Sequence, residues 1–201
     1  DHQLVLEKDG QESTQHYSKL VLAIGANPVR LAIAGDASDD IHVVNNLSDY
    51  KAFRNNLAAS EDKRVVILGA GLIGCEFAND LQNTDHQVTV IDLAPQPLGR
   101  LLPEHVATAF QKNLEETGIH FVLGTTVEKV SRADNGDYLV TLANGQSLVA
   151  DVVLSAVGLQ PNISLAKQAD VHTSRGVLNT AQLETNQADI YAVGDSAEVN
   201  G

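Results

Sequence analysis

Residues 65–76 read VVILGAGLIGCE, and this stretch decides the fold. Four apolar residues with the length of a buried strand run into three glycines, Gly69, Gly71 and Gly74, which satisfy the pattern G-x-G-x-x-G. An amphipathic helical pattern follows, and then a second apolar run, Val88 to Ile91. The stretch therefore predicts a βαβ unit that binds a dinucleotide, because the motif is preceded by a strand and opens a helix.

Each glycine has its own physical role in such a turn. Gly69 permits the tight turn, and Gly74 allows the helix to pack closely on the strand. Gly71 lets backbone N–H groups approach a pyrophosphate at the positive end of the helix. Leu72 and Ile73 lie between these glycines and complete the predicted cofactor-binding turn.

An acidic residue, Asp92, ends the second strand at the distance from the glycines that dinucleotide sites require. A carboxylate here accepts hydrogen bonds from the adenosine ribose hydroxyls and repels a 2′-phosphate, so we expect NADH to be preferred over NADPH. Two alternatives stay open. Asp92 could simply begin the next loop, and that loop, which contains Pro95 and Pro97, could bring Arg100 back towards a 2′-phosphate.

The rest of the central region continues the alternation of strands and helices. Pro103 suits the first turn of a helix that ends at Gly118, and Ile119 to Leu123 follows as another strand. Two Asn-Gly dipeptides, at 135–136 and 144–145, lie between alternating runs and predict β-hairpins. We therefore expect an α/β, Rossmann-like domain with a doubly wound parallel sheet and a small antiparallel layer.

The region before this domain has a different pattern. Leu4 to Leu6 and Thr14 to Tyr17 bracket a turn and predict a hairpin, and Leu20 to Ile24 predicts a buried strand. No sustained period follows until a short amphipathic helix, predicted from Ser48 as its N-cap to Leu57. We therefore place a domain boundary near residue 41.

Three apolar runs end in glycine, at Gly25, Gly158 and Gly194. Ligands gather at the carboxyl ends of strands in open α/β sheets, so three such ends indicate nucleotide sites. Hydrophobic strands also end in glycine without any ligand, and for each run taken alone that alternative stays open.

Composition narrows the classes of function. The 201 residues carry a net charge of −13, which argues against nucleic acid or an anionic membrane as a partner. No apolar run approaches the roughly 18 residues of a membrane span, and we expect a cytoplasmic protein. The seven His residues fall at no metal-ligand spacing, so we expect no metal site.

The sequence contains no Met and begins at Asp1 within a strand pattern, so we expect a fragment of a longer protein. The single cysteine, Cys75, lies on the motif helix. A redox role is one interpretation of Cys75, but we expect it to be a small buried thiol without such a role.

Gly69 to Glu76, followed by Asp92, resembles the NADH-binding unit of the FAD-dependent pyridine nucleotide-disulfide oxidoreductase superfamily. Glu184 to Asp195, a spacer and an apolar strand that ends in Gly194-Asp195, is similar to the late FAD motif of the same superfamily. Gly158 lies in a stretch similar to the return crossing between its domains.

The resemblance implies a division of the chain by cofactor. An NADH-binding domain, residues 41–158, would be inserted between two segments of an FAD-binding domain, residues 1–40 and 159–201. The first FAD motif of the family would lie before Asp1, and its C-terminal domain after Gly201.

The resemblance also implies roles for single residues. Asp195 would hydrogen-bond the ribityl chain of FAD, and Gly194 would let that chain pass. Glu76 would lie near the flavin and the nicotinamide amide, where a carboxylate can orient both rings for hydride transfer. A helix N-terminus favours any Glu electrostatically, so a purely structural role for Glu76 stays open.

Residues 71–78 look most like those of rubredoxin reductases, flavoproteins that pass electrons from NADH through FAD to rubredoxin, a small iron protein. Other activities of the superfamily are the first alternative: ferredoxin reductase, NADH oxidase or disulfide reductase. The second alternative is that the fragment alone is a catalytically silent NADH-binding module.

Overall fold

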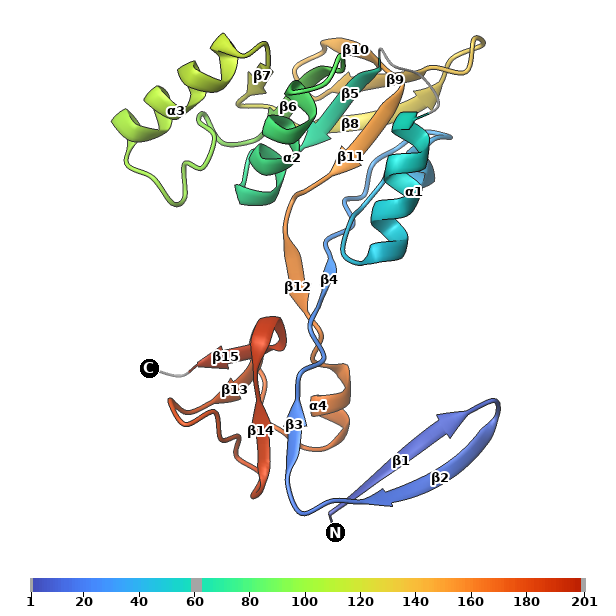
Figure 1. Cartoon of the computed structure of the whole chain (residues 1–201), viewed down its shortest axis with the longest axis vertical. Helices are drawn as coiled ribbons and strands as arrows, with labels where there is room; N and C mark the ends of the chain where they lie inside the picture. The colour runs from blue at the N-terminus through green and yellow to red at the C-terminus, as the bar shows by residue number, and fades with distance from the viewer. Residues whose placement is uncertain (1, 59–62, 200–201) are drawn as a thin grey trace. The chain divides into compact units, whose positions relative to one another are not determined.

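The computed structural model describes residues 2–58 and 63–199, and Asp1 and Gly201, the outer limits of the predicted FAD segments, lie outside the described residues. The chain divides into two units. Unit 2 is Pro28–Gly158, and unit 1 is formed by the flanking segments Asp1–Asn27 and Leu159–Gly201 (Figure 1). One stretch of chain is thus inserted between the two segments of another unit.

A four-stranded parallel sheet forms the centre of unit 2. Its strand order is β11 (Val152–Ser155), β5 (Arg64–Leu68), β6 (Gln87–Asp92) and β7 (His120–Leu123). Parallel sheets are covered on both faces, and the near-continuous apolar runs of these strands fit that requirement. The sequence predicted all four strands, and the α/β, Rossmann-like fold is confirmed.

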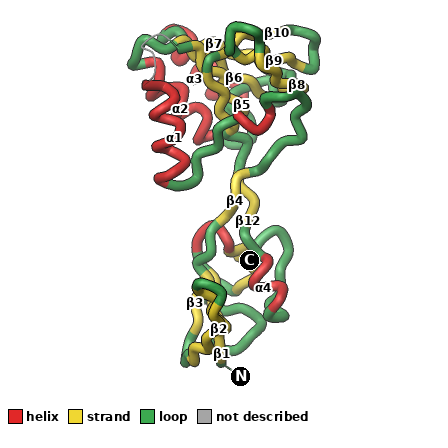
Figure 2. Tube along the Cα trace, turned by 90° about the vertical axis from the view of Figure 1, so that its right-hand side faces the viewer, coloured by secondary structure: helices red, strands yellow, loops and turns green. Residues whose placement is uncertain are grey.

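The side chains of β5 alternate between two cores. Val65 and Ile67 belong to the first core cluster, together with side chains from α1 (Leu47–Ala58), α2 (Leu72–Gln82) and α3 (Glu104–Glu116). Val66 and Leu68 belong to the second cluster, on the opposite face of the sheet. Unit 2 therefore has three layers, with the helices on one side of the parallel sheet (Figure 2).

The third layer is the predicted antiparallel sheet. It has the order β10 (Ser147–Ala150), β9 (Tyr138–Leu142) and β8 (Val127–Arg132). Gly136 and Gly145, the second residues of the two Asn-Gly turns, have φ angles of 90° and 86°. Both predicted hairpins are confirmed, because Gly reaches this left-handed region at no steric cost.

Unit 1 contains short elements around a small core. The hairpin β1 (Gln3–Lys8) and β2 (Gln11–His16) was predicted. Parallel pairs join β3 (Leu20–Leu22) to β14 (Ile190–Ala192) and β13 (Val177–Asn179) to β15 (Ala197–Val199). The helix α4 (Ser164–Gln168) and the 3-10 turn η2 (Gly194–Ser196) also belong to unit 1. β12 (Leu159–Pro161) pairs with β4 (Ala26–Pro28), whose last residue is the first of unit 2.

Residues 29–40, which the sequence suggested as a connection before a boundary near residue 41, pack within unit 2 and include the 3-10 turn η1 (Ser38–Asp40). Ala34 accepts the N–H of Val130 at 2.8 Å and donates to Glu128 at 3.0 Å. This segment is therefore an irregular neighbour of β8. The division of the chain by cofactor stays a prediction.

The N-cap of α1 differs from the sequence prediction. The helix begins at Leu47, and Asn46 Oδ1 accepts the backbone N–H of Asp49 at 3.0 Å. Asn46 therefore caps the helix in place of Ser48, which lies inside it. Within the described part of the chain, no helix is both long and apolar enough to cross a bilayer.

Candidate dinucleotide site

The glycine turn joins the end of β5 to the start of α2. Gly69 has a φ of 102°, and its N–H donates to Ile91 O at 2.7 Å. A Cβ on Gly69 would lie 2.5 Å from Ala156 O, and a Cβ on Gly74 would lie 1.9 Å from Gly69 O. Packing within the protein therefore requires both glycines.

Gly71, the N-cap of α2, is different. Its φ of −78° and ψ of −171° suit any residue, and a Cβ there would meet no described protein atom within 4 Å. Nothing in the fold therefore requires glycine at this position. Open space before the unpaired N–H groups of a helix N-terminus fits a phosphate group, so the turn fits the pyrophosphate of a dinucleotide.

Asp92 lies at the carboxyl end of β6 and is half-buried. Its Oδ2 accepts the N–H of Ala70 at 2.6 Å, and its Oδ1 accepts the N–H of Ala94 at 2.7 Å. The carboxylate thus fastens the glycine turn on one side and its own loop on the other. Each oxygen retains a further lone pair, with which it can accept a ribose hydroxyl.

The first turns of α2 present three exposed side chains. Leu72 is 59% exposed and Ile73 is 39% exposed. Glu76 is exposed and makes no hydrogen bond or ion pair with the residues that the structure describes. All three are accessible to a ligand at the glycine turn.

Cys75 points the other way, into the first core cluster. It is 4% exposed, and its Sγ donates to Ala70 O at 3.5 Å. Burial raises the pKa of the thiol to about 11, so it is protonated at neutral pH. The expectation of a small buried thiol is confirmed.

The remaining predicted residues lie elsewhere. Gly194, with a φ of 69°, and the exposed Asp195 form the 3-10 turn η2 after β14, in unit 1. Gly158 is the last residue of unit 2, has a φ of 112° and accepts the N–H of Val29 at 3.0 Å. The structure therefore brings together the glycine turn, Glu76 and Asp92, and separately Gly194 and Asp195.

Sequence reasoning missed two parts of the candidate dinucleotide site. The first is the backbone of Ala70. Its N–H donates to Asp92, and its carbonyl accepts hydrogen bonds from Cys75 and Leu98. The second is Leu98 itself, which has a left-handed φ of 54°. No sequence signal marks either residue, because Ala and Leu are neutral choices in a turn-rich stretch.

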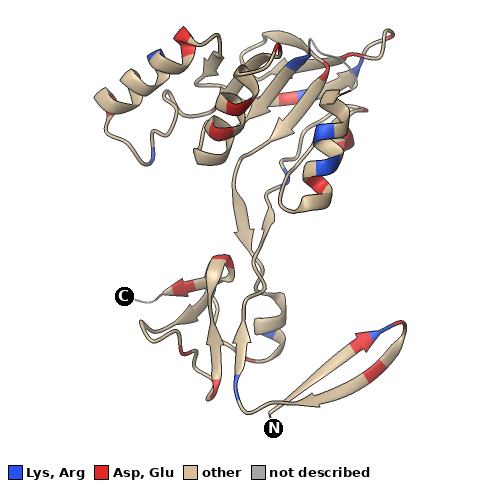
Figure 3. Ribbon diagram, viewed as in Figure 1, with Lys and Arg blue, Asp and Glu red and all other residues tan. Residues whose placement is uncertain are grey.

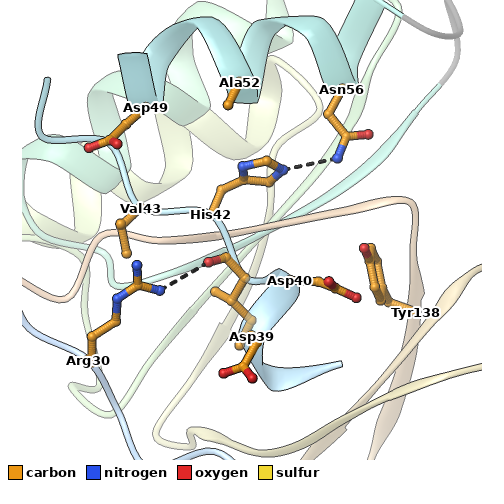
Figure 4. A pocket seen from close by; sticks show the side chains of 10 residues that line it. Arg30, Asp39, Asp40, His42, Val43, Asp49, Ala52, Asn56 and Tyr138 are labelled. Carbon is orange, nitrogen blue, oxygen red and sulfur yellow. Dashed lines mark hydrogen bonds between the residues drawn. The ribbon is translucent and has the colours of Figure 1, made fainter. Parts of the chain in front are cut away.

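A separate cavity of about 350 Å³ lies between η1 and α1 (Figure 4). His42 Nε2 accepts from Asn56 Nδ2 at 3.0 Å, and burial lowers the pKa of His42. Arg30 donates to Ile41 O at 3.4 Å across the same cavity. Sequence reasoning gave no signal for this cavity, and none of its lining residues belongs to the glycine turn.

Among the residues that the structure describes, no group of three or more His, Cys, Asp or Glu side chains could hold a metal ion.

The family model for pyridine nucleotide-disulphide oxidoreductases matches residues 1–200. The chain belongs to this family. Pyridine nucleotide-disulphide oxidoreductases similar to it include the rubredoxin-NAD(+) reductase of Acinetobacter baylyi, which is 77% identical over all 201 residues. The rubredoxin-NAD(+) reductase of Alcanivorax borkumensis is 47% identical over 186 residues, or 92% of the chain. The chain spans about half the length of these relatives, 51% and 48%.

Two solved structures are also similar to the chain. A putidaredoxin reductase, determined as a covalent complex with putidaredoxin, aligns with the whole chain at a TM-score of 0.89 and 29% identity, over 48% of its own length. A ferredoxin reductase from Rhodopseudomonas palustris aligns with 93% of the chain at a TM-score of 0.85 and 30% identity, over 46% of its own length.

Proposed function

We propose that this chain is the nucleotide-binding part of a flavoprotein oxidoreductase that transfers a hydride from NADH to FAD and electrons onward to rubredoxin. The identity of 77% over the whole chain to the rubredoxin-NAD(+) reductase of Acinetobacter baylyi carries this proposal. We expect the flavoprotein to work in the cytoplasm.

Unit 2 would bind NADH. The open space at Gly71 and the N–H groups at the start of α2 would receive the pyrophosphate. The free lone pairs of Asp92 would accept the adenosine ribose hydroxyls. Leu72 and Ile73, exposed in the present structure, would cover an apolar part of the nucleotide.

The remaining residues would serve the flavin. Glu76, which has no partner in the described structure, would orient the nicotinamide and flavin rings towards each other. Asp195 would hold the ribityl chain, while Gly194 and Gly158 would leave room for the cofactors. FAD, when bound, supplies the exchange between two-electron and one-electron chemistry, and the protein supplies placement.

Replacement of Asp92 tests the NADH site. The Asp92→Ala variant loses charge-assisted hydrogen bonds worth about 1.5 to 3 kcal/mol, so its Kd for NADH should rise roughly ten- to a hundred-fold. Calorimetry on the 201-residue chain measures this, with the exposed Asp134→Ala as a matched control. Equal affinity of Asp92→Ala and the parent chain for NADH would refute the assignment.

The acceptor is tested with the full-length protein. Given NADH, it should reduce rubredoxin much faster than glutathione disulfide, lipoamide or oxidised thioredoxin. Acidic residues occur in both units of this chain (Figure 3). The rate should therefore also depend on ionic strength, because charge steers the docking of electron carriers. Efficient reduction of a disulfide would contradict the proposal.

A second candidate is a ferredoxin reductase. The similarity to putidaredoxin reductase and to the Rhodopseudomonas ferredoxin reductase, at 29% and 30% identity, supports this candidate. The same assay with a [2Fe–2S] ferredoxin in place of rubredoxin separates the two candidates.

A further inference from the structure

The loop that follows β6 is fastened to the glycine turn by Leu98. The N–H of Leu98 donates to Ala70 O at 2.8 Å, and its side chain packs against the first core cluster. Its carbonyl in turn accepts the N–H groups of Leu101 and Leu102 at 2.8 and 3.0 Å. One residue therefore joins the turn, the core and the end of the loop.

Leu98 holds this place in a conformation that leucine disfavours. Its φ of 54° is left-handed, where a Cβ crowds the neighbouring backbone. A residue stays in such a conformation only when its surroundings over-determine it. The docked N–H and the packed side chain of Leu98 are the interactions that hold it there.

The same contacts connect the loop to Asp92. Ala70, which is 2% exposed, is held at its N–H by Asp92 and at its carbonyl by both Leu98 and Cys75. Asp92 also accepts the N–H of Ala94, at the start of the loop. A displacement of the loop would therefore move the Asp92 carboxylate, which we propose accepts the ribose hydroxyls.

The loop also contains Arg100, a cation that could favour NADPH over NADH by binding a 2′-phosphate. Arg100 is exposed and has no hydrogen bond or ion pair among the described residues. A loop that moved freely could bring this side chain to a 2′-phosphate. Anchoring at Leu98, two residues earlier, restricts that movement.

We propose that Leu98 is a positioning residue that fixes the loop of residues 93–102 against the glycine turn and thereby maintains the preference for NADH over NADPH. This inference rests on the proposed binding of NADH to the same turn.

The test compares Leu98→Gly with two matched controls in the 201-residue chain. Leu98→Gly keeps the N–H and removes the side-chain anchor. Val44→Ala removes apolar packing from the same cluster, and Leu183→Gly replaces another left-handed leucine, with a φ of 68°, in unit 1. Calorimetry gives the Kd for NADH and NADPH, and hydrogen exchange without nucleotide reports on the Leu101 and Leu102 amides.

For Leu98→Gly we expect the Kd for NADH to rise about tenfold and the preference over NADPH to fall several-fold. The Leu101 and Leu102 amides should exchange faster, because they bond to the carbonyl of Leu98. Both controls should keep the parental preference. If Leu98→Gly fails to fold, Leu98→Asn, which tolerates the left-handed conformation, carries the same expectations.

The outcomes separate the two proposals. A parent chain that prefers NADH, together with a Leu98→Gly variant of unchanged preference, overturns the role of Leu98 and leaves the NADH site standing. A parent chain that binds no NADH overturns the proposed function, and this inference with it.

Discussion

The three glycines of the turn are constrained by different neighbours. Gly69 and Gly74 are required by protein atoms, because a Cβ on either would lie within 2.5 Å of a backbone oxygen. Gly71 has ordinary backbone angles and open space around it. The packing of the fold therefore accounts for Gly69 and Gly74 but not for Gly71.

Alanine substitutions should separate these constraints. Gly71→Ala should destabilise the chain by no more than about 1 kcal/mol, the usual cost of a poorer N-cap, and raise the Kd for NADH at least about tenfold. Gly74→Ala should destabilise the chain by about 1 to 3 kcal/mol, because its Cβ overlaps Gly69 O. Urea unfolding and calorimetry measure the two quantities. Normal NADH affinity in a stable Gly71→Ala variant would remove the ligand as the reason for that glycine.

Glu76 should affect the reaction more than binding. In the full-length protein, Glu76→Gln should slow the reduction of bound FAD by NADH about tenfold or more, because an amide no longer orients the rings as a carboxylate does. The Kd for NADH should stay within a few-fold of the parent value. Stopped-flow absorbance measures the rate, and an unchanged rate would leave Glu76 with only an electrostatic role at the helix N-terminus.

At the scale of elements, one ion-pair network holds the start of the central sheet. Arg64, the first residue of β5, donates from Nε and one terminal nitrogen to both oxygens of Asp151, each at 2.9 Å. The same guanidinium contacts Asp137, in the hairpin between β8 and β9, at 2.8 Å. The network thus joins two neighbouring parallel strands to the antiparallel layer.

This network predicts a dependence of stability on pH. Hydrogen bonds from Arg64 lower the pKa of Asp151 from 3.8 to about 2. Because the folded state lowers this pKa, ionised Asp151 stabilises the fold above pH 4, by about 1 kcal/mol once solvent screening of the partly exposed ion pair is included. This contribution is lost as pH falls from about 4 towards 2. Urea unfolding across this range should show a weaker pH dependence for Asp151→Asn than for the parent. The exposed Asp134→Asn is the control, and identical pH profiles for parent and Asp151→Asn would contradict the prediction.

The regular helices and strands could be predicted from the sequence, because apolar residues recur in them at regular spacing and turn residues separate them. The apolar strands around the glycine turn and the two Asn-Gly hairpins were each placed within a few residues. Residues 29–40 could not be predicted, because they meet β8 through an isolated bridge, Ala34 with Lys129, and not through a periodic ladder. Asn46 and Ser48 are both good helix caps, so only the structure distinguishes them.

The candidate site divides in the same way. The glycines and Asp92 are recognisable because a ligand demands particular residue types at fixed spacing. The hydrogen bonds that hold Ala70 are not recognisable in the sequence. Ala70 takes part in them through its backbone N–H and carbonyl, which nearly every residue possesses. Leu98 is hidden for a further reason, since leucine is among the residues least expected at a φ of 54°.

At the scale of the whole molecule, unit 2 has its own cores and the complete glycine turn. A protein consisting of residues 28–158 should therefore fold cooperatively and bind NADH with a Kd within about threefold of that of the full 201-residue chain. Circular dichroism during urea unfolding and calorimetry test this. A molten or NADH-silent product would show that unit 2 depends on the flanking segments.

The two ends of unit 2 lie one hydrogen bond apart, from the N–H of Val29 to Gly158 O at 3.0 Å. A host protein needs only a single exposed loop to accept a guest whose ends meet, since the entry and exit points coincide. Unit 2 is therefore a transferable cassette. Grafted into a surface loop of an unrelated protein, such as a fluorescent protein, it would carry the candidate dinucleotide site into that host through a single point of insertion.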